Sequence, residues 1–345
     1  MAHFDDDLAL HVKALAIEAG FARVGIAPAG DVLDGRRFVE WLQRGFHASM
    51  GYLARNVGKR LRPDRLVPGS RSVICLAVGY APSPEDPAPQ VSVARYARGR
   101  DYHKLLRRRC QRLMDRIRAA EPGFGGRAFV DSAPVLERSL AQAAGLGWIG
   151  RNCCLIAPGL GSYVLLCEIV CNLPLRPDGP VEGGCRDCGA CVRACPTGAL
   201  SEAGLDARRC VSYLTVEHAG RIEPALRPGM GTCLVGCDRC QVVCPQNADA
   251  PPGDGELRGD GLALGGALLG GVLGWTEDQW DAATRGSAAR RVRYAELLRN
   301  AVLAAGNSAG APEAPALAGA LGDLRSRRED LHDMIDWALG RLARP

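Results

Sequence analysis

Apolar and polar positions divide the chain of 345 residues into three zones. In the first zone, residues 8–19 repeat apolar side chains at helical spacing and stop at Gly20, which predicts a helix. Residues 72–79 form an almost unbroken apolar run, which predicts a buried strand. Because helical and strand patterns alternate over residues 1–180, we expect an α/β domain there.

The other two zones have different patterns. Residues 181–250 are punctuated by glycine and proline and are too polar to form an ordinary core. Residues 251–345 consist mainly of helix-forming residues from Trp275 onward, with a break at residues 306–310. Two or more helix pairs fit this pattern, so we expect an all-α, HEAT-like helical-repeat domain.

Composition restricts the class of protein and its compartment. With 47% hydrophobic and 23% charged residues, the chain can bury a full-sized core and is not disordered. The first residues lack the basic and apolar stretches of a signal peptide, and the longest apolar stretch, residues 261–275, is too short to cross a bilayer. We therefore expect a cytoplasmic protein with no membrane partner, whose thiols stay reduced.

Fifteen cysteines are present, and nine of them lie between Cys185 and Cys244. Reduced thiols at this density indicate metal binding. The run Cys185-x-x-Cys188-x-x-Cys191-x-x-x-Cys195-Pro matches a motif for iron–sulfur clusters in which the fourth cysteine binds a second cluster. The run Cys237-x-x-Cys240-x-x-x-Cys244-Pro repeats its second half. The spacing predicts two [4Fe-4S] clusters in a ferredoxin-like domain over residues 181–250.

The same motif assigns ligands to the two clusters. The first takes Cys185, Cys188, Cys191 and Cys244, and the second takes Cys195, Cys237 and Cys240. Its fourth ligand is Cys210 or Cys233; we favour Cys210, although spacing alone leaves both open. Two zinc sites are the alternative, but the triple CxxCxxC run and the proline after each final cysteine favour iron–sulfur clusters.

Asp131 and Ser132 stand between a predicted strand at residues 127–130 and a predicted amphipathic helix at residues 134–144. Because α/β domains place ligand chemistry where a strand leads into a helix, Asp131 is a candidate functional residue. The alternative is a helix N-cap, for which aspartate is a common choice. The glycines that follow at residues 145–150 fit GxGxxG, but a dinucleotide site needs a strand before them, so we interpret Gly145 as a helix C-cap.

Two basic stretches indicate a polyanionic partner. Residues 95–118 hold ten Lys or Arg against two acids, with tyrosines among them. A second stretch in the helical tail comprises Arg285, Arg290, Arg291, Arg293 and Arg299, accompanied only by Glu296. Solvated helix faces are the ordinary explanation of such runs. Two stretches in separate zones and a net charge of +5 nevertheless fit a large nucleic acid.

Several segments are distinctive when taken in order. They are residues 95–103 (RYARGRDYH), residues 130–138 (VDSAPVLER), residues 145–152 (GLGWIGRN), the two cysteine runs with residues 210–215 (CVSYLT), residues 297–300 (LLRN) and residues 306–308 (GNS). Together they resemble the epoxyqueuosine reductase family. The resemblance extends through nearly the whole chain, whereas simple ferredoxins share only the cysteine runs.

The resemblance implies a cobalamin-dependent enzyme that acts on tRNA. Members of this family reduce the epoxide of epoxyqueuosine at the wobble position of the anticodon loop, which leaves queuosine. An N-terminal domain holds cobalamin, a ferredoxin-like domain carries two four-iron clusters, and a helical-repeat tail helps to bind tRNA. The family relation also implies that Cys210, and not Cys233, is the fourth ligand of the second cluster.

The resemblance further implies roles for single residues. Asp131 corresponds to the proton donor, and we expect partial desolvation to raise its pKa. Four other residues fall in segments that contact the cofactor and substrate in similar proteins, although each has an ordinary alternative as a surface or capping residue: Arg55, Arg138, Asn152 and Ser162. No Asp-x-His-x-x-Gly run is present, the nearest being residues 101–106, so we expect cobalamin without a histidine ligand.

The electrons must come from outside the chain, and we expect a one-electron donor such as ferredoxin or flavodoxin to reduce the clusters. Two positions depart from the family pattern, because Cys153-Cys154 and Gln246 stand where relatives usually have other residues, an aromatic one in the case of Gln246. Two alternative functions share part of the pattern. One is a reductive dehalogenase-like cobalamin enzyme, and the other is a plain two-cluster electron carrier.

Overall fold

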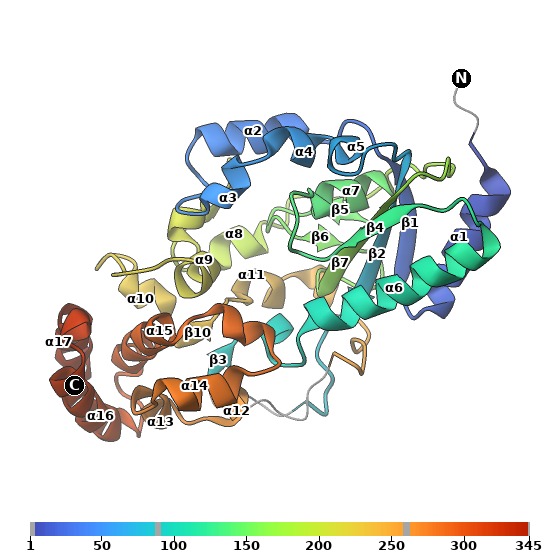
Figure 1. Cartoon of the computed structure of the whole chain (residues 1–345). Coiled ribbons are helices and arrows are strands. Elements are labelled where there is room, and N and C mark those ends of the chain that lie inside the picture. The colour runs from blue at the N-terminus through green and yellow to red at the C-terminus, as the bar shows by residue number, and fades with distance from the viewer. Residues whose placement is uncertain (1–3, 87–90, 258–262, 344–345) are drawn as a thin grey trace.

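The computed structural model describes residues 4–86, 91–257 and 263–343. Its main sheet contains β1 (Arg23–Pro28), β2 (Ser72–Gly79), β7 (Val164–Cys171) and β4 (Gly126–Phe129) in the order β1-β2-β7-β4 (Figure 1). All of β2 except its last residue is buried, which confirms the predicted strand. Every neighbouring pair is antiparallel, so the rule for parallel α/β sheets that singles out Asp131 does not apply to this sheet.

Helices cover both faces of this sheet. On one face lie α1 (Asp6–Glu18), which confirms the first predicted helix, and α6 (Tyr102–Ala120), whose apolar side enters the larger core (Figure 1). On the other face lies α7 (Glu137–Ala143), which packs with β1, β2 and β7 around a second, smaller core. Alternation along β2 and β7 sends successive side chains into the two cores.

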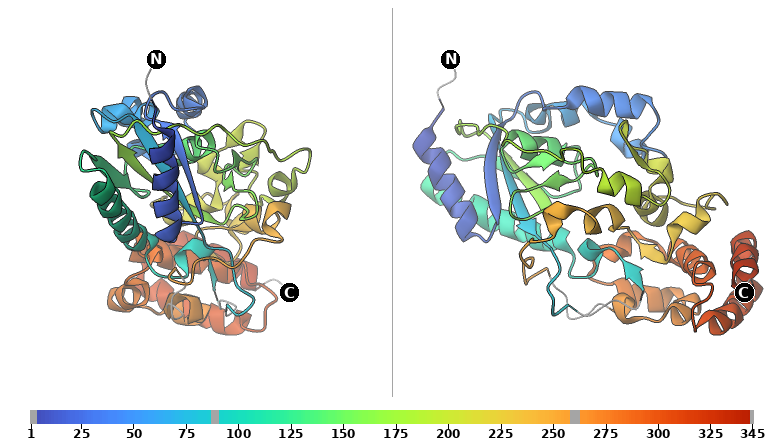
Figure 2. Two further views of the ribbon diagram at one scale, coloured as in Figure 1. Left: turned by 90° about the vertical axis from the view of Figure 1, so that its right-hand side faces the viewer. Right: turned by 180° about the vertical axis from the view of Figure 1, so that it is seen from behind.

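Short elements connect the sheet to the rest of the molecule. After β1 come α2 (Gly35–Gln43), α3 (Gly51–Ala54), α4 (Val57–Leu61) and α5 (Pro63–Leu66), which lie at the end opposite the C-terminal helices (Figure 2). After α7 the strands β5 (Trp148–Ile149) and β6 (Leu155–Ile156) form a small hairpin. The indole N–H of Trp41 in α2 donates to the carbonyl of Leu205 at 2.7 Å, which ties this end to the cysteine-rich segment.

The cysteine-rich segment contains only short elements and lies between the sheet and the C-terminal helices (Figure 1). They are α8 (Ala190–Ala194), β8 (Leu200–Ser201), β9 (Gly204–Leu205), η2 (Ala207–Arg209), α9 (Val211–Val216), α10 (Arg227–Met230), β10 (Cys233–Val235), α11 (Arg239–Val242) and η3 (Pro245–Asn247). Strand β10 pairs in parallel with β3 (Ser92–Val93), which η1 (Arg95–Ala97) follows. Because one apolar core runs through all three zones, the domain boundaries at 180 and 250 remain predictions.

The tail is helical, as the composition predicts. Its elements are α12 (Ala263–Gly266), α13 (Leu269–Leu273), α14 (Glu277–Thr284), η4 (Ala288–Arg291), α15 (Tyr294–Gly306), α16 (Ala314–Arg327), η5 (Glu329–Leu331) and α17 (His332–Leu342). The break between α15 and α16 confirms the interruption expected near residues 306–310. Among the described residues, none of the helices has the length and apolar character needed to span a membrane.

Helix α15 fastens the tail to the cysteine-rich segment. Arg299 is 2% exposed and donates to the carbonyls of Leu214, His218 and Gly220 at 2.6–2.9 Å. Asn300 is fully buried and donates to the carbonyls of Thr215 and Leu234 at 2.9 and 2.8 Å. Arg299 therefore caps backbone carbonyls inside the protein, and counting it among the residues of a polyanion-binding stretch is wrong.

An Asn300→Ala protein is expected to be less stable by about 2–4 kcal/mol, because two buried carbonyls lose their donor and each unsatisfied group costs about 1–3 kcal/mol. Thermal unfolding monitored by circular dichroism measures the change. Ser326→Ala, which removes an exposed hydroxyl bonded to the Asp323 carbonyl, is the matched control and should unfold near the parent temperature. Equal unfolding temperatures for both variants would contradict this role of Asn300.

Candidate active site and cluster sites

Asp131 lies in the turn between β4 and α7 and has a left-handed backbone, with φ of 50°. This conformation costs a residue other than glycine about 1–3 kcal/mol. The turn is held by the backbone N–H of Asp131, which donates to Oε1 of Glu137 at 2.7 Å. Because α7 begins at Glu137 and its N-cap is Leu136, the interpretation of Asp131 as the N-cap of that helix is wrong.

The carboxylate of Asp131 meets two side chains from the first turn of α6. The hydroxyl of Tyr102 donates to Oδ2 of Asp131 at 2.9 Å, and Nε2 of His103 lies 3.3 Å from the same oxygen. On its other side, Nδ1 of His103 lies 2.8 Å from Oδ1 of Asp101, which is the N-cap of α6. Our sequence interpretation missed Tyr102 and His103 as functional residues, although an Asp N-cap two residues before a histidine is a local signal for such a pair.

The electrostatics of Asp131 differ from the sequence expectation. Burial raises the pKa of Asp131, but hydrogen bonds from His103 and Tyr102 and the positive charges of His103 and Arg291 lower it by more, so the pKa lies below its ordinary value. The expectation of a raised pKa is therefore wrong for this structure. Burial lowers the pKa of His103, but hydrogen bonds to Asp131 and Asp101 raise it above its ordinary value. The contacts therefore favour a carboxylate at Asp131 and the charged ring at His103.

Two buried carboxyl groups lie behind Asp131, and sequence reasoning missed both. Burial, with the nearby charge of Asp131, raises the pKa of Glu137 to about 8. Burial also raises the pKa of Glu168 in β7, and the nearby charge of Glu137 raises it further. Neither Glu168 oxygen has a hydrogen-bond partner in the described structure. Both groups are therefore neutral near pH 7, and Glu137 can hold the Asp131 turn without adding a second negative charge.

The predicted cofactor contacts are not all brought together. Arg138 donates to the carbonyl of Cys153, and Asn152, only 5% exposed, has an Nδ2 without a partner in the described structure. The hydroxyl of Ser162 instead lies within 3.0–3.4 Å of the Asn247 and Gln241 amides. Arg55 is exposed at the end of α3. The unpaired Asn152 amide N–H fits cobalamin, whose periphery carries amide oxygens that can accept it.

The ligands predicted for the first cluster surround one cavity. Cys185, Cys188, Cys191 and Cys244 line a cavity of about 30 Å³, together with Asn152 and Pro245 among others. Within the described residues, no three His, Cys, Asp or Glu side chains converge as the ligands of a single metal ion do. Four thiols around a cavity suit a cluster that is bound at separate iron atoms. The backbone N–H of Arg151 lies 3.3 Å from the Cys185 sulfur, as a donor to a thiolate would.

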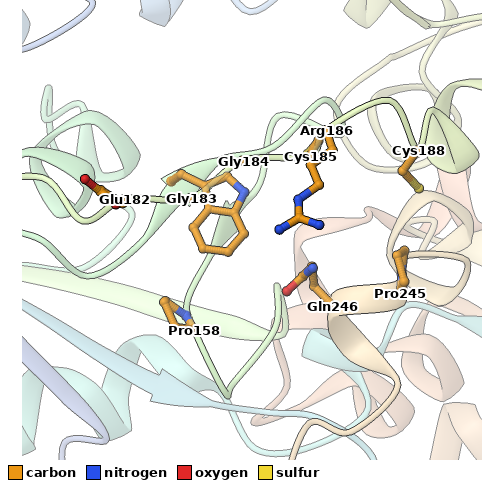
Figure 3. Close-up of a pocket in the computed structure, with 10 residues that line it drawn as sticks. Pro158, Glu182, Gly183, Gly184, Cys185, Arg186, Cys188, Pro245 and Gln246 are labelled. Atoms are coloured by element: carbon orange, nitrogen blue, oxygen red, sulfur yellow. The ribbon is translucent and has the colours of Figure 1, made fainter.

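A larger hollow opens beside this cavity. Cys185 and Cys188, from the loop before α8, stand opposite Pro245 and Gln246 of η3, and the side chain of Arg186 points across the hollow toward Gln246 (Figure 3). Cys188 is the exposed member of its ligand set. Gln246, which departs from the family pattern, thus lines this hollow beside two of the predicted ligands.

The ligands predicted for the second cluster are set deeper. These ligands are Cys195, Cys210, Cys237 and Cys240. Cys210 interacts electrostatically with both Cys195 and Cys240, so these three thiols lie near one another. The backbone N–H of Ala199 lies 3.2 Å from the Cys195 sulfur. The thiol of Cys233 lies against Cys237, so the structure brings both candidates for the fourth ligand near this site.

Comparison with known proteins gives the family. The family model described as "Epoxyqueuosine reductase QueG, DUF1730" matches residues 60–132, and the model of a 4Fe-4S double cluster binding domain matches residues 184–247. The epoxyqueuosine reductase of Pseudomonas aeruginosa is 41% identical over 347 residues, which cover 97% of this chain and 94% of that protein. The chain belongs to the epoxyqueuosine reductase family. Two [4Fe-4S] clusters and cobalamin are the cofactors of an epoxyqueuosine reductase, so the zinc and electron-carrier alternatives are set aside.

Solved epoxyqueuosine reductases have the same fold. The enzyme from Streptococcus thermophilus matches with a TM-score of 0.85 and 27% identity, over 97% of this chain and 90% of that one. An epoxyqueuosine reductase in complex with an epoxyqueuosine-modified tRNA-Tyr stem loop matches with a TM-score of 0.82 and 26% identity, over 98% of this chain and 99% of that one. The order of a sheet, a double-cluster segment and helices is therefore that of the family.

The glycine motif has a structural explanation in this epoxyqueuosine reductase. After α7, the N–H of Gly145 donates to the Gln142 carbonyl at 3.1 Å and that of Leu146 to the Ala141 carbonyl at 2.9 Å, with φ of 77° at Gly145. These two bonds form a Schellman motif, which agrees with the C-cap prediction. A Cβ at Gly147 would lie 2.1 Å from the Ile156 carbonyl oxygen, so close packing of the β5–β6 hairpin requires that glycine.

The basic stretches expected to meet tRNA are only partly free. In the basic stretch of the tail, four of the five arginines form ion pairs: Arg285 and Arg290 with Asp281, Arg291 with Glu217, and Arg293 with Glu296. In α6, Arg109 is buried and pairs with Asp254 and Glu256. Other basic residues of α6 are exposed on its outer side, among them Lys104, Arg108 and Arg112. Any phosphate contacts of this family member are therefore concentrated on fewer side chains than the sequence suggests.

Proposed function

We propose that this protein reduces the epoxide of epoxyqueuosine at the wobble position of tRNA to give queuosine, in the cytoplasm. The observation that carries the proposal is Asp131, exposed beside the polar groups of Tyr102 and His103, in a chain that matches the family over 97% of its length. Its side chain is 59% exposed although protein atoms crowd it on most sides, which suits an acid that meets a bound substrate.

The reaction removes the epoxide oxygen as water, so it breaks two carbon–oxygen bonds and needs two electrons and two protons. Cobalamin, when bound, supplies a strongly reducing cobalt centre for the epoxide carbon. Of the four predicted contacts, Arg55, Arg138, Asn152 and Ser162, the one with an unpaired donor to hold it is Asn152. Asp131 supplies the proton that the departing oxygen needs, because an unprotonated alkoxide is a poor leaving group. The Tyr102 hydroxyl holds the carboxylate in place for that transfer.

Burial suggests the direction of electron flow. Cys188 is exposed in the first ligand set, so an external donor such as ferredoxin or flavodoxin would reduce the first cluster. None of the thiols in the second set is exposed. Electrons would thus enter at the first cluster and leave from the second.

The test is conversion of a defined substrate. The purified holoprotein, with a one-electron reductant under anaerobic conditions, should convert an anticodon stem loop that contains epoxyqueuosine into the queuosine form, as measured by nucleoside mass spectrometry. Absence of queuosine from a protein with full iron and cobalamin content would overturn the proposal. A queuosine product without corrinoid in the protein would exclude the cobalamin part.

Binding of the tRNA stem loop is expected to weaken with salt, because each neutralised phosphate releases a counterion. With three or four phosphate contacts, log Kd should rise with log salt with a slope of about 2–3. Fluorescence anisotropy between low and physiological ionic strength measures the slope. A slope near zero would show that the exposed α6 cations do not meet the phosphate backbone.

A further inference from the structure

The proposed reaction delivers two protons to one oxygen atom. The first converts the opened epoxide oxygen into a hydroxyl, and the second lets that hydroxyl leave as water while the carbon–carbon double bond forms. The two electrons come from the external donor. If a single acid beside the oxygen delivers both protons, that acid must be protonated twice in each turnover. Asp131 rests as a carboxylate, so each of its protons has to come from another group.

We propose that His103 gives Asp131 both protons in turn and takes each of them back at Nε2 from solvent, while Asp101 keeps the opposite nitrogen protonated. The inference rests on the proposed function, and it assigns to His103 a relay role that acts through Asp131. The imidazole lies between two carboxylates, with Nε2 3.3 Å from Oδ2 of Asp131 and Nδ1 2.8 Å from Oδ1 of Asp101. Catalytic hydrogen bonds are often this long before the substrate binds.

The ring of His103 is fixed in the orientation that a relay needs. Asp101 accepts from both the backbone N–H and Nδ1 of His103, and the ring stacks on Tyr102 with centroids 4.0 Å apart. With Nδ1–H donated to Asp101, the neutral ring presents the lone pair of Nε2 toward Asp131, and the charged ring presents N–H there. The side chains of His103 and Asp101 are 28% and 21% exposed, so water reaches both.

The transfers balance without any further reactant. The Nε2 proton of charged His103 moves to Oδ2 of Asp131, which leaves a neutral ring and a neutral acid. Asp131 then protonates the oxygen and returns to a carboxylate, while Nε2 of His103 takes a proton from solvent. The same cycle supplies the second proton, and the oxygen departs as water. Each cycle consumes one proton from solvent, and two cycles account for the two protons of the reaction.

The charges around His103 favour its protonated form. Asp101 and Tyr102 face it from α6, Asp131 from the turn after β4, and Glu137 from α7. Arg291 of η4 acts on Asp131 and keeps that group ionised. Since the two aspartates outweigh burial, the pKa of His103 is raised. His103 is therefore protonated below this pKa and loses its proton as the pH rises through it. Turnover should accordingly fall on the alkaline side.

Histidine C2-hydrogen exchange, followed by mass spectrometry on the holoprotein, tests the charge state without any turnover. The midpoint of His103 should lie above the ordinary value of about 6.5. In the Asp101→Asn protein it should shift downward, while that of exposed His11 serves as the internal reference and stays in place. A His103 midpoint at or below the ordinary value, or one unmoved by Asp101→Asn, would overturn the relay.

Kinetics test the transfer itself. His103→Gln keeps a hydrogen-bonding side chain but no titrating group, so turnover should fall at least about tenfold and lose its alkaline limb. Added imidazole should restore part of the activity of His103→Ala. Tyr102→Phe, which removes the other bond to the same oxygen, should keep the alkaline limb and gain nothing from imidazole. If the parent makes queuosine and His103→Gln matches its pH profile, the relay fails while the proposed function stands.

Discussion

An Asp131→Asn protein is expected to lose about 100-fold to 10,000-fold in turnover, the usual range for a positioned proton donor. Asparagine has nearly the same shape and can still accept the hydrogen bond from Tyr102, but it cannot carry a proton from His103 to the oxygen. The residual rate should depend little on pH between about 6 and 8, because the titrating relay no longer leads to the substrate. Single-turnover formation of queuosine in the stem loop measures the loss.

The matched control is Asp115→Asn on the outer face of α6. Asp115 has a side-chain exposure of 57%, close to the 59% of Asp131, and is paired with Arg118. Its substitution should leave turnover within about twofold, since isolated surface pairs contribute little. Iron and cobalamin contents of both variants are measured first, so that lost cofactor cannot imitate lost acid. Full turnover by a cofactor-replete Asp131→Asn protein would exclude Asp131 as the proton donor.

The cysteine motif was predictable because its information is local. Four ligands within eleven residues, from Cys185 to Cys195, can surround a cluster only in a few ways, and the proline after the last one turns the chain. The cavity formed by Cys185, Cys188, Cys191 and Cys244 fits that prediction, although Cys244 comes from a distant segment. The strand at residues 72–79 was predictable for the same reason, because burial on both faces leaves an unbroken apolar run.

The partners of Asp131 were not predictable from local pattern. His103 precedes it by 28 residues, and only the packing of α6 on the sheet brings the two together. Without that contact, burial is the one effect on Asp131 that sequence reasoning can estimate, and burial alone gives the wrong direction of its pKa shift. The buried carboxyl group of Glu168 was not predicted either, because it is a single acid within an otherwise apolar strand.

Basic runs were the least reliable guide, because sequence does not show which charges are already paired. The sequence pattern places Arg299 in a cationic surface, but in the structure it is buried against backbone carbonyls. The sheet also differs from the expectation, since alternating helices and strands do not determine strand direction. Its long connections carry α6 and α7 to opposite faces while every neighbouring pair stays antiparallel.

Substitution of Cys210 by alanine is expected to remove the second cluster and to abolish turnover. Three thiolates remain for a cluster that needs four ligands, so iron should fall from about eight atoms per chain to about four. The first cluster has its own four ligands and should persist, with its electron paramagnetic resonance signal after reduction. On the proposed order of electron transfer, electrons from the donor would then have no path to the active site.

Cys233→Ala is the matched control, because Cys233 is the other candidate for the fourth ligand. Its thiol lies against Cys237 and 3.7 Å from the Ser92 hydroxyl, and it is 5% exposed. If it only fills space, its substitution leaves about eight iron atoms and costs stability alone, on the order of 1 kcal/mol for a small buried side chain. The reverse pattern, with iron lost from Cys233→Ala and kept in Cys210→Ala, would exchange the two assignments. Iron kept by both single variants and lost by the double variant would show that either thiol can complete the cluster, since both lie within reach of the same site.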